Sequence, residues 1–556
     1  MILRMTNKLK VAVVFCQVAL ISSCEPENPA ELILFNANVL TVDEQNSTAA
    51  AVAIAGGRIT AIGSSKLILR HAGRETTKID LDGKTLIPGI VDAHTHIRGI
   101  AGNIGKLNIT DATSVVEVLA TIKRYADTLP AGAWIETATG WQPTNFTENR
   151  VPTRDELDKA APEHPVFLKK GYQNGVVNSK ALELAGITAE NAGLNFLRDS
   201  GNNLSGEIYG SLDEITAAQP QLGAEQIERS YEAAMQLVNS FGVTSLRDAA
   251  LAPAQVELLR SLAEANRLTV RINAVGLIYP RTPLQVDKQM WADVPVSRGD
   301  WFTHDTLKIV ADGGISDALL RDDYAWTDSG EAGFRGRFVT QMDKIKAVAA
   351  WACETDRKLA VHAIGDAMID RLLDHYEAIR NECNVGQLGW TIEHVALVTS
   401  DQVDRIKNLK ISVTTQSGLN YSLASAWRKY WGEERMARSI PNRLLIDGGV
   451  MPGGGTDANT GPVNTFVAIW SDVTRQTRDG IVGAEQAVTP LESLRMHTIW
   501  AAQVLGTHHD VGSIEVGKFA DLAVLDRDIL SIPFNSIKDT QVVMTIINGD
   551  IVFERD

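Results

Sequence analysis

Residues 87–99, which read IPGIVDAHTHIRG, decide how the rest of this chain is interpreted. The apolar first half predicts a buried β-strand, and Asp92, His94 and His96 follow where that strand ends. Side chains two residues apart lie on the same side of an extended strand, so His94 and His96 can bind one metal ion together. A His-x-His pair alone is more often an ordinary pair of surface or core residues, so a metal site needs support from elsewhere in the chain.

The overall composition is typical of a large globular protein. The 556 residues exceed one ordinary domain, and a hydrophobic content of 44% with 22% charged residues can form a substantial core. The formal net charge of −15 argues against nucleic acid as a partner, because phosphate groups would be repelled. Neither the charge nor the scattered apolar residues define an interface, so a homo-oligomer stays possible without being indicated.

The amino-terminal segment has the pattern of an export signal. Three basic residues precede the apolar run VAVVFCQVALI, which is too short to cross a bilayer. The run leads into Ser22-Ser23-Cys24, which resembles the cleavage box of bacterial lipoproteins. We therefore predict a signal peptide at 1–23, a lipid on Cys24, a tether at 24–31, and an exported protein anchored in the cell envelope and facing the periplasm. The alternative is an ordinary signal peptide followed by an incidental cysteine.

Two further cysteines, Cys353 and Cys383, lie in the body of the chain. They have neither the paired spacing of a zinc ribbon nor the density of a disulfide scaffold, so buried thiols are the first interpretation. A disulfide between them is possible in an exported protein if their Cα atoms come close enough.

The pattern of apolar residues predicts two kinds of architecture. Short β-rich runs separated by Gly, Asn and Asp turns fill 32–87 and indicate part of a small β-sandwich. From residue 88, apolar strand-like runs alternate with amphipathic helical stretches over about 400 residues. This predicts an α/β fold, a (β/α)₈ TIM barrel with insertions, of which the main one is expected around 103–240. Catalytic groups of such a barrel lie at the C-terminal ends of its strands, where the His94 pair is expected.

Four more polar residues follow short apolar runs. They are Lys308 in LKIVADGG, His362 in LAVHAIGD, His394 in TIEHVAL and Asp457 in MPGGGTDAN. A lone buried histidine is usually satisfied by hydrogen bonds, and a lone lysine or aspartate usually reaches solvent, so none of them is informative singly. Together they form an ordered set of strand-end residues.

This ordered set resembles the amidohydrolase superfamily, whose pattern is His-x-His on the first barrel strand, a lysine midway, two single histidines and a late aspartate. All six positions are present, and the resemblance runs from about Leu32 to the C-terminus. The segment GSIEVGKFADLAVLD at 512–526 resembles the one that returns the chain to the β-sandwich, which implies a barrel over 88–510 and the second part of the sandwich at 511–556. GWQPTNF, VPTRDELDKAAPEHPVFL, VNSKALELAGI and VHAIGD are similar to the branch that includes N-substituted formamide deformylases.

The resemblance implies a role for each residue of the set. His94 and His96 would bind a first metal, His362 and His394 would bind or face a second, and Asp457 would contact metal and water. Lys308 cannot bind a metal as an ammonium, but carboxylation by CO₂ would turn it into an anionic bridge between two metals. The alternative is a salt bridge from Lys308, for example to Asp312, in a one-metal site.

These ligand types are suited to Zn²⁺, as one or two ions, although other divalent metals remain open. A metal-activated water would attack the carbonyl carbon of a small amide-like substrate, Asp457 would carry the proton to the leaving nitrogen, and His394 could help to polarise the carbonyl. We therefore expect a hydrolase of non-peptide C–N bonds in amides, formamides or cyclic amides. A C–O hydrolase acting on lactones or esters and a non-catalytic binding lipoprotein are the alternatives.

Residues around the substrate are harder to assign. Relatives often carry Asp-Gly-His where this chain has Gly171-Tyr172-Gln173, so Tyr172 and Gln173, together with Trp141, are candidates for the pocket wall. Tyr324 is a further aromatic candidate, although aromatic residues more often belong to a core. Glu393 and Asp366 flank predicted ligands and could orient them, but neighbouring strand residues point to opposite faces in the case of Glu393. His304 is expected at the opposite, stability-determining end of its strand.

Overall fold

The computed structural model describes residues 28–171, 174–458 and 460–555. The predicted signal peptide and Cys24 lie outside these residues, as do Tyr172 and Gln173. Within the described ranges, none of the helices has the length and apolar character required to cross a membrane.

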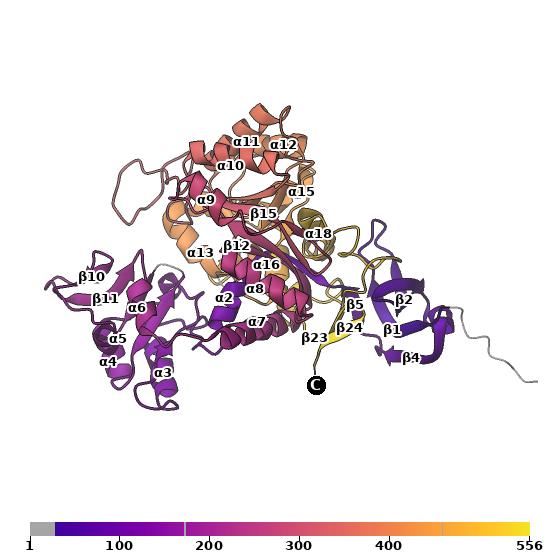
Figure 1. Cartoon of the computed structure of the whole chain (residues 1–556), viewed down its shortest axis with the longest axis horizontal. Coiled ribbons are helices and arrows are strands. Elements are labelled where there is room, and N and C mark those ends of the chain that lie inside the picture. Colours follow the sequence, from indigo (N-terminus) through magenta and orange to yellow (C-terminus); the bar gives the residue numbers. More distant parts are fainter. Residues whose placement is uncertain (1–27, 172–173, 459, 556) are drawn as a thin grey trace, which may run out of the picture.

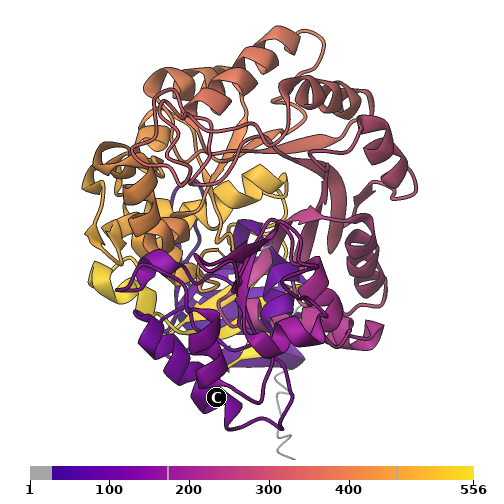
Figure 2. The same ribbon diagram turned by 90° about the vertical axis from the view of Figure 1, so that its left-hand side faces the viewer.

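A nearly closed barrel of eight parallel strands forms the centre of the molecule (Figures 1 and 2). Its strands are β6 (Ile90–Thr95), β12 (Val243–Leu251), β13 (Arg271–Leu277), β15 (Phe302–Val310), β16 (Lys358–Ala363), β17 (Thr391–His394), β18 (Ser412–Thr415) and β19 (Gly453–Gly454). Neighbours in this order pair in parallel. The last strand returns to the first, because the Asp457 amide donates to the His94 carbonyl at 2.8 Å. The predicted (β/α)₈ barrel is therefore confirmed.

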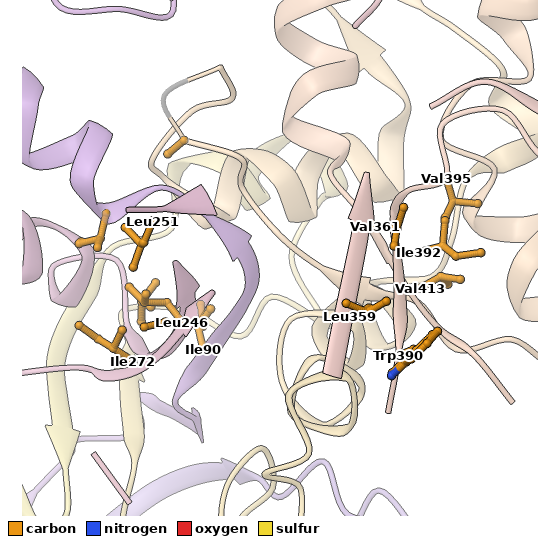
Figure 3. Packing of buried hydrophobic residues seen from close by; sticks show 14 of the residues in the cluster. Ile90, Leu246, Leu251, Ile272, Leu359, Val361, Trp390, Ile392, Val395 and Val413 are labelled. Carbon is orange, nitrogen blue, oxygen red and sulfur yellow. The ribbon is translucent and has the colours of Figure 1, made fainter. Parts of the chain in front are cut away.

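Helices cover the outside of the barrel. The longer ones are α7 (Ala224–Asn239), α8 (Pro253–Glu264), α10 (Met342–Glu354), α11 (Asp366–Ile379), α12 (Ser400–Leu409), α13 (Ser417–Trp431) and α16 (Thr465–Thr474). Shorter ones are α9 (Leu284–Met290), α14 (Glu433–Ala437), α15 (Asn442–Asp447), α17 (Pro490–Met496) and α18 (Ile499–Leu505). Apolar residues recur in these helices at helical spacing and form one buried face. In α11 this face consists of Met368, Ile369, Leu372, Leu373 and Tyr376. These faces join outward side chains of the strands, such as Leu359, Val361 and Ile392, in one large core (Figure 3).

Both ends of the chain contribute to a second sheet of eight strands. The N-terminal part supplies β1 (Ala30–Leu40), β2 (Thr48–Ala55), β3 (Arg58–Gly63), β4 (Ala72–Asp80) and β5 (Thr85–Pro88), and the C-terminal part supplies β22 (Leu522–Leu525), β23 (Val542–Ile547) and β24 (Asp550–Glu554). The two parts meet where β5 pairs antiparallel with β22. Side chains from both, including Leu34, Leu86, Val524 and Ile546, share a core.

An insertion separates β6 from β12. It follows α2 (Ile97–Asn103) and contains the helices α3 (Val115–Ala126), α4 (Arg154–Ala160), α5 (Ser179–Leu184) and α6 (Asp213–Ala218). Its own five-stranded sheet consists of β7 (Ile135–Glu136), β8 (Val166–Lys170), β9 (Asn174–Val177), β10 (Phe196–Arg198) and β11 (Leu204–Tyr209). The insertion and the sheet of the two chain ends lie on opposite sides of the barrel (Figure 1). Because β6 enters from the terminal sheet and leaves toward the insertion, the insertion lies on the side of its C-terminal end.

Cys353 and Cys383 form a disulfide, with Cα atoms 5.9 Å apart. The bond joins the end of α10 to the loop that follows α11. The possible disulfide is therefore present, and the first interpretation of two free buried thiols is wrong.

Candidate metal centre

The six residues of the ordered set lie at the C-terminal ends of five barrel strands. His94 lies near the end of β6 and His96 directly follows this strand, Lys308 lies in β15, His362 in β16 and His394 in β17, and Asp457 follows β19. The ring centroids of His94 and His394 are 4.6 Å apart, and those of His362 and His394 are 4.4 Å apart. Residues far apart in the sequence thus form one cluster, because the C-terminal ends of the strands meet on one side of a barrel.

The tightest group of possible metal donors consists of His94, His394 and Asp457. One donor atom from each lies within 4.8 Å of the other two, and all three residues are buried. Asp457 also contacts the other histidine of the first strand, since its Oδ1 lies 3.1 Å from Nε2 of His96 and 3.7 Å from Nε2 of His94. The backbone of Asp457 is in the left-handed region, with φ 48°, as the chain turns inward after β19.

Backbone carbonyls hold two of the histidine rings in place. The Ala249 carbonyl lies 2.8 Å from Nδ1 of His96, and the Gly313 carbonyl lies 3.2 Å from Nε2 of His362. A carbonyl oxygen only accepts hydrogen bonds, so the bonded nitrogen of each ring carries a proton. The other nitrogen, Nε2 of His96 or Nδ1 of His362, is the one that would bind a metal.

Side-chain oxygens lie beside Nδ1 of the other two histidines. Oε1 of Gln416 lies 2.8 Å from Nδ1 of His394, and Oε1 of Glu393 lies 3.1 Å from Nδ1 of His94. These contacts leave Nε2 of both rings for the cluster. Gln416 was missed in the sequence, where its only signal is a position directly after the predominantly polar strand β18.

Glu393 lies inside the barrel, in contrast to the expectation that it faces away from its neighbour His394. Its side chain is fully buried and contacts the ammonium of Lys308. Neighbouring side chains do not point to opposite faces here, because His394 and Val395 have φ values of 75° and 42°, outside the extended region.

The salt bridge considered for Lys308 therefore has a different acceptor from Asp312. The carboxylate of Asp312 accepts instead from the amides of Leu319, Ile364 and Gly365 at 2.9–3.1 Å.

Burial sets the electrostatics of the cluster. It lowers the pKa of His94 and of His394 well below the usual value, and together with the charge of Lys308 it lowers the pKa of His362 to about 3. Burial also lowers the pKa of Lys308 to about 7. Burial alone would raise the pKa of Asp457, but its hydrogen bond with His96 and the charges nearby more than offset this and lower it. The low pKa values of His94, His362 and His394 leave these imidazoles neutral, and Asp457 adds an ionised carboxylate, a donor set that suits a zinc-like ion.

A buried carboxylate connects the first and last strands behind the cluster. Asp92 accepts from the amide and the hydroxyl of Thr456 at 3.0 and 2.6 Å, and from the His94 amide at 3.3 Å. Gly455 packs so closely against β6 that a Cβ there would lie 2.7 Å from the amide nitrogen of His94. These contacts fix the spacing between His94 and Asp457.

The other candidates make hydrogen bonds or packing contacts of their own. Trp141 is buried in the core of the insertion, and its indole donates to the Lys169 carbonyl at 2.9 Å. The hydroxyl of Tyr324 donates to the Ala318 carbonyl at 2.9 Å, and the carboxylate of Asp366 accepts from the Arg321 amide. His304 is fully buried, with Nδ1 3.0 Å from the Ala274 carbonyl in the neighbouring strand.

Comparisons with known proteins agree with this arrangement. A sequence model of the family described as "Amidohydrolase family" matches residues 77–553. The N-substituted formamide deformylase of Arthrobacter pascens is 30% identical over 94% of this chain and 98% of its own. The 5-methylthioadenosine/S-adenosylhomocysteine deaminase of Symbiobacterium thermophilum is 26% identical over 44% of this chain and 60% of its own. The crystal structure of an uncharacterized metal-dependent hydrolase from Pyrococcus furiosus superposes with a TM-score of 0.70 and 26% identity over 90% of this chain and 100% of its own.

Proposed function

The chain belongs to the amidohydrolase family, and on this basis we propose that it hydrolyses the C–N bond of a small N-substituted formamide or related amide with the help of zinc. The observation that carries the proposal is the convergence of His94, His394 and Asp457, whose donor atoms lie within 4.8 Å of one another. The formamide deformylase among the relatives supports the substrate class, and the deaminase supports C–N chemistry in general.

The residues of the tightest donor group have separate parts in the proposed reaction. His94, His394 and Asp457 would hold a zinc ion, which would supply Lewis-acid activation of the amide carbonyl and of a water molecule. Asp457 accepts the proton of that water and delivers it to the leaving nitrogen, because its carboxylate is ionised and faces the cluster beside Nε2 of His96. His394 would bind the zinc ion through Nε2, and its orientation is kept by the hydrogen bond between Nδ1 and Gln416.

Lys308 has two possible states in this centre. Without carboxylation, Lys308 directs its nitrogen to Glu393 and adds no ligand, which corresponds to a centre with one zinc ion. Carboxylated Lys308 would add an anionic ligand and favour two ions. We favour the one-metal centre, because the Glu393 carboxylate already balances the charge of Lys308.

Metal analysis and substrate turnover test the proposal together. The purified full chain should contain about one zinc ion, and His94→Ala combined with His96→Ala should remove it. Amine release from N-substituted formamides should depend on this metal, and a matched series of lactones and esters measures the competing C–O chemistry. Well-folded protein that binds no metal after zinc is added back would contradict the proposal and favour a binding protein. Faster cleavage of lactones than of formamides would show that the enzyme hydrolyses C–O bonds instead.

We also propose that the mature chain is exported and held to a membrane by a lipid on Cys24. The sequence pattern before Cys24 motivates this, and the Cys353–Cys383 disulfide supports it, because such bonds persist mainly outside the reducing cytosol. Cell fractionation should place the protein with membranes, and Cys24→Ser should release it. A soluble cytosolic pool of the unaltered chain would contradict the anchor. The molecular mass of the protein in mild detergent tests for a homo-oligomer.

A further inference from the structure

The buried carboxylate of Glu393 has three basic neighbours inside the barrel. Its Oε1 lies 3.1 Å from Nδ1 of His94 and 3.8 Å from Nη1 of Arg247, and its Oε2 contacts the ammonium of Lys308. The side chains of His94, Arg247 and Lys308 are, like that of Glu393, almost completely shielded from solvent. A carboxylate this deeply buried persists as an ion only if such neighbours balance it.

Arg247 gives Glu393 a permanent counter-charge. The guanidinium is held from three sides, by Asn273 Oδ1 at 3.2 Å, Thr391 Oγ1 at 3.3 Å and the Val504 carbonyl at 3.1 Å. It therefore cannot swing away from Glu393 without losing these bonds. The charge of Glu393 is kept in place even when the state of Lys308 changes.

The two histidines of the tightest donor group have different supporting acceptors. Nδ1 of His94 faces the carboxylate of Glu393, whereas Nδ1 of His394 faces the neutral amide of Gln416. The amide is oriented by its own donation from Nε2 to the hydroxyl of Thr414 at 3.0 Å. An anionic acceptor makes an imidazole a stronger donor to a metal than a neutral acceptor does.

From this difference we infer that Glu393 is a positioning residue of the centre: its carboxylate beside Nδ1 of His94 favours a proton on that nitrogen and strengthens Nε2 as a ligand, which makes β6 the side on which the metal is anchored. The inference rests on the proposed metal function and assigns Glu393 a role that acts through His94. Glu393 itself is not placed among the ligands, because both of its oxygens are engaged by basic groups.

Zinc affinity of Glu393→Gln is the decisive measurement. Glutamine has the same shape and can keep an oxygen beside Nδ1 of His94, so this substitution removes the negative charge and the acceptor that faces Lys308. We expect the zinc dissociation constant of the full chain, measured by competition with a chromophoric chelator, to rise about 10–100-fold. The absorption spectrum of the Co²⁺-loaded protein should change with it, because a weaker His94 alters the ligand field.

Asp521→Asn is the matched control. Asp521 forms a buried, two-point ion pair with Arg271, at 2.6 and 3.0 Å, at the other end of the barrel. The Asp521→Asn substitution measures the general effect of breaking a buried ion pair. We expect it to lower the thermal midpoint and to leave the zinc dissociation constant within threefold of the native value. A similar loss of affinity in both variants would overturn the inference, as would native-like affinity in Glu393→Gln.

A measurement on the native chain covers the case in which Glu393→Gln does not fold. In zinc-loaded protein with ¹⁵N-labelled histidine, His94 should show a slowly exchanging proton on Nδ1, assigned by its disappearance in His94→Gln. Absence of that resonance would overturn the inference. Absence of zinc binding by the native chain would instead refute the proposed function, so the two failures are distinguishable.

Discussion

Gly455→Ala should disturb the metal centre without altering any ligand. The new Cβ would lie 2.7 Å from the amide nitrogen and 2.8 Å from the carbonyl oxygen of His94, whereas ordinary contacts begin at 3.4 Å. The backbone must therefore move by about 0.7 Å at this point. The backbone at His94 and the backbone at Gly455 are both held by hydrogen bonds, because the Asp457 amide donates to the His94 carbonyl and the Gly455 amide donates to the Thr415 carbonyl.

The size of the effect follows from this displacement. Overpacking of a rigid interior costs about 1–3 kcal/mol of unfolding free energy. A functional group must stay within about 0.5 Å of its productive position, and a misplacement near 1 Å can cost about 100-fold in rate. We therefore expect Gly455→Ala to fold, to lower the thermal midpoint, and to reduce metal-dependent turnover by about 10–100-fold.

Gly102→Ala is the control for adding a methyl group. Gly102 lies in α2, near His96 in the chain, and a Cβ there would meet nothing within 4 Å. Alanine should leave turnover unchanged and stabilise the protein slightly, since it favours a helix over glycine by about 1 kcal/mol. Native turnover and zinc affinity in Gly455→Ala would contradict the expected effect of close packing. An equal loss of turnover in Gly102→Ala would contradict it as well.

Three other substitutions test separate parts of the structure. Asp457→Asn should retain zinc while turnover falls about 10²–10⁴-fold, because the proton acceptor is lost; full turnover would exclude its role. Replacing Cys353 and Cys383 together with serine should lower the unfolding free energy by about 3–4 kcal/mol, given their separation of 30 residues, and chemical denaturation measures this. Burial lowers the pKa of His304 from 6.5 to about 4, so stability present above pH 6.5 should be lost as the pH falls toward 4, by about 3 kcal/mol in total. The His304→Gln variant should show a flatter pH profile of the thermal midpoint, and an identical slope would contradict this assignment.

The barrel and the six strand-end residues were predictable because they follow from repeating geometry. In a parallel barrel every apolar strand ends on the same side, so polar residues directly after such strands must meet. His362 and Asp457 lie far apart in the sequence, yet the rule places both beside the first strand. The same regularity predicted that His304, earlier in its strand than Lys308, lies at the opposite end of the strand.

The supporting residues were less predictable, because local backbone departures decide where they point. Glu393 was expected to face away from His394, and only the left-handed backbone at His394 and Val395 brings both residues inside. Gln416 has no spacing that distinguishes it from an ordinary strand-end amide. The buried position of Trp141 depends on the packing of the insertion, which the alternating pattern of the barrel does not specify.

The pairing of β5 with β22 affects how the protein can be made. Strand β5 comes directly before β6, which contains His94, and its partner β22 is complete only after residue 525 has been synthesised. Until then, the growing chain has an unpaired sheet edge beside its metal-binding segment. Such a long-range closure is slow compared with helix formation. The C-terminal strand β22 therefore completes the sheet from which β6 continues. Nascent chains that end before Leu522 should remain sensitive to proteases.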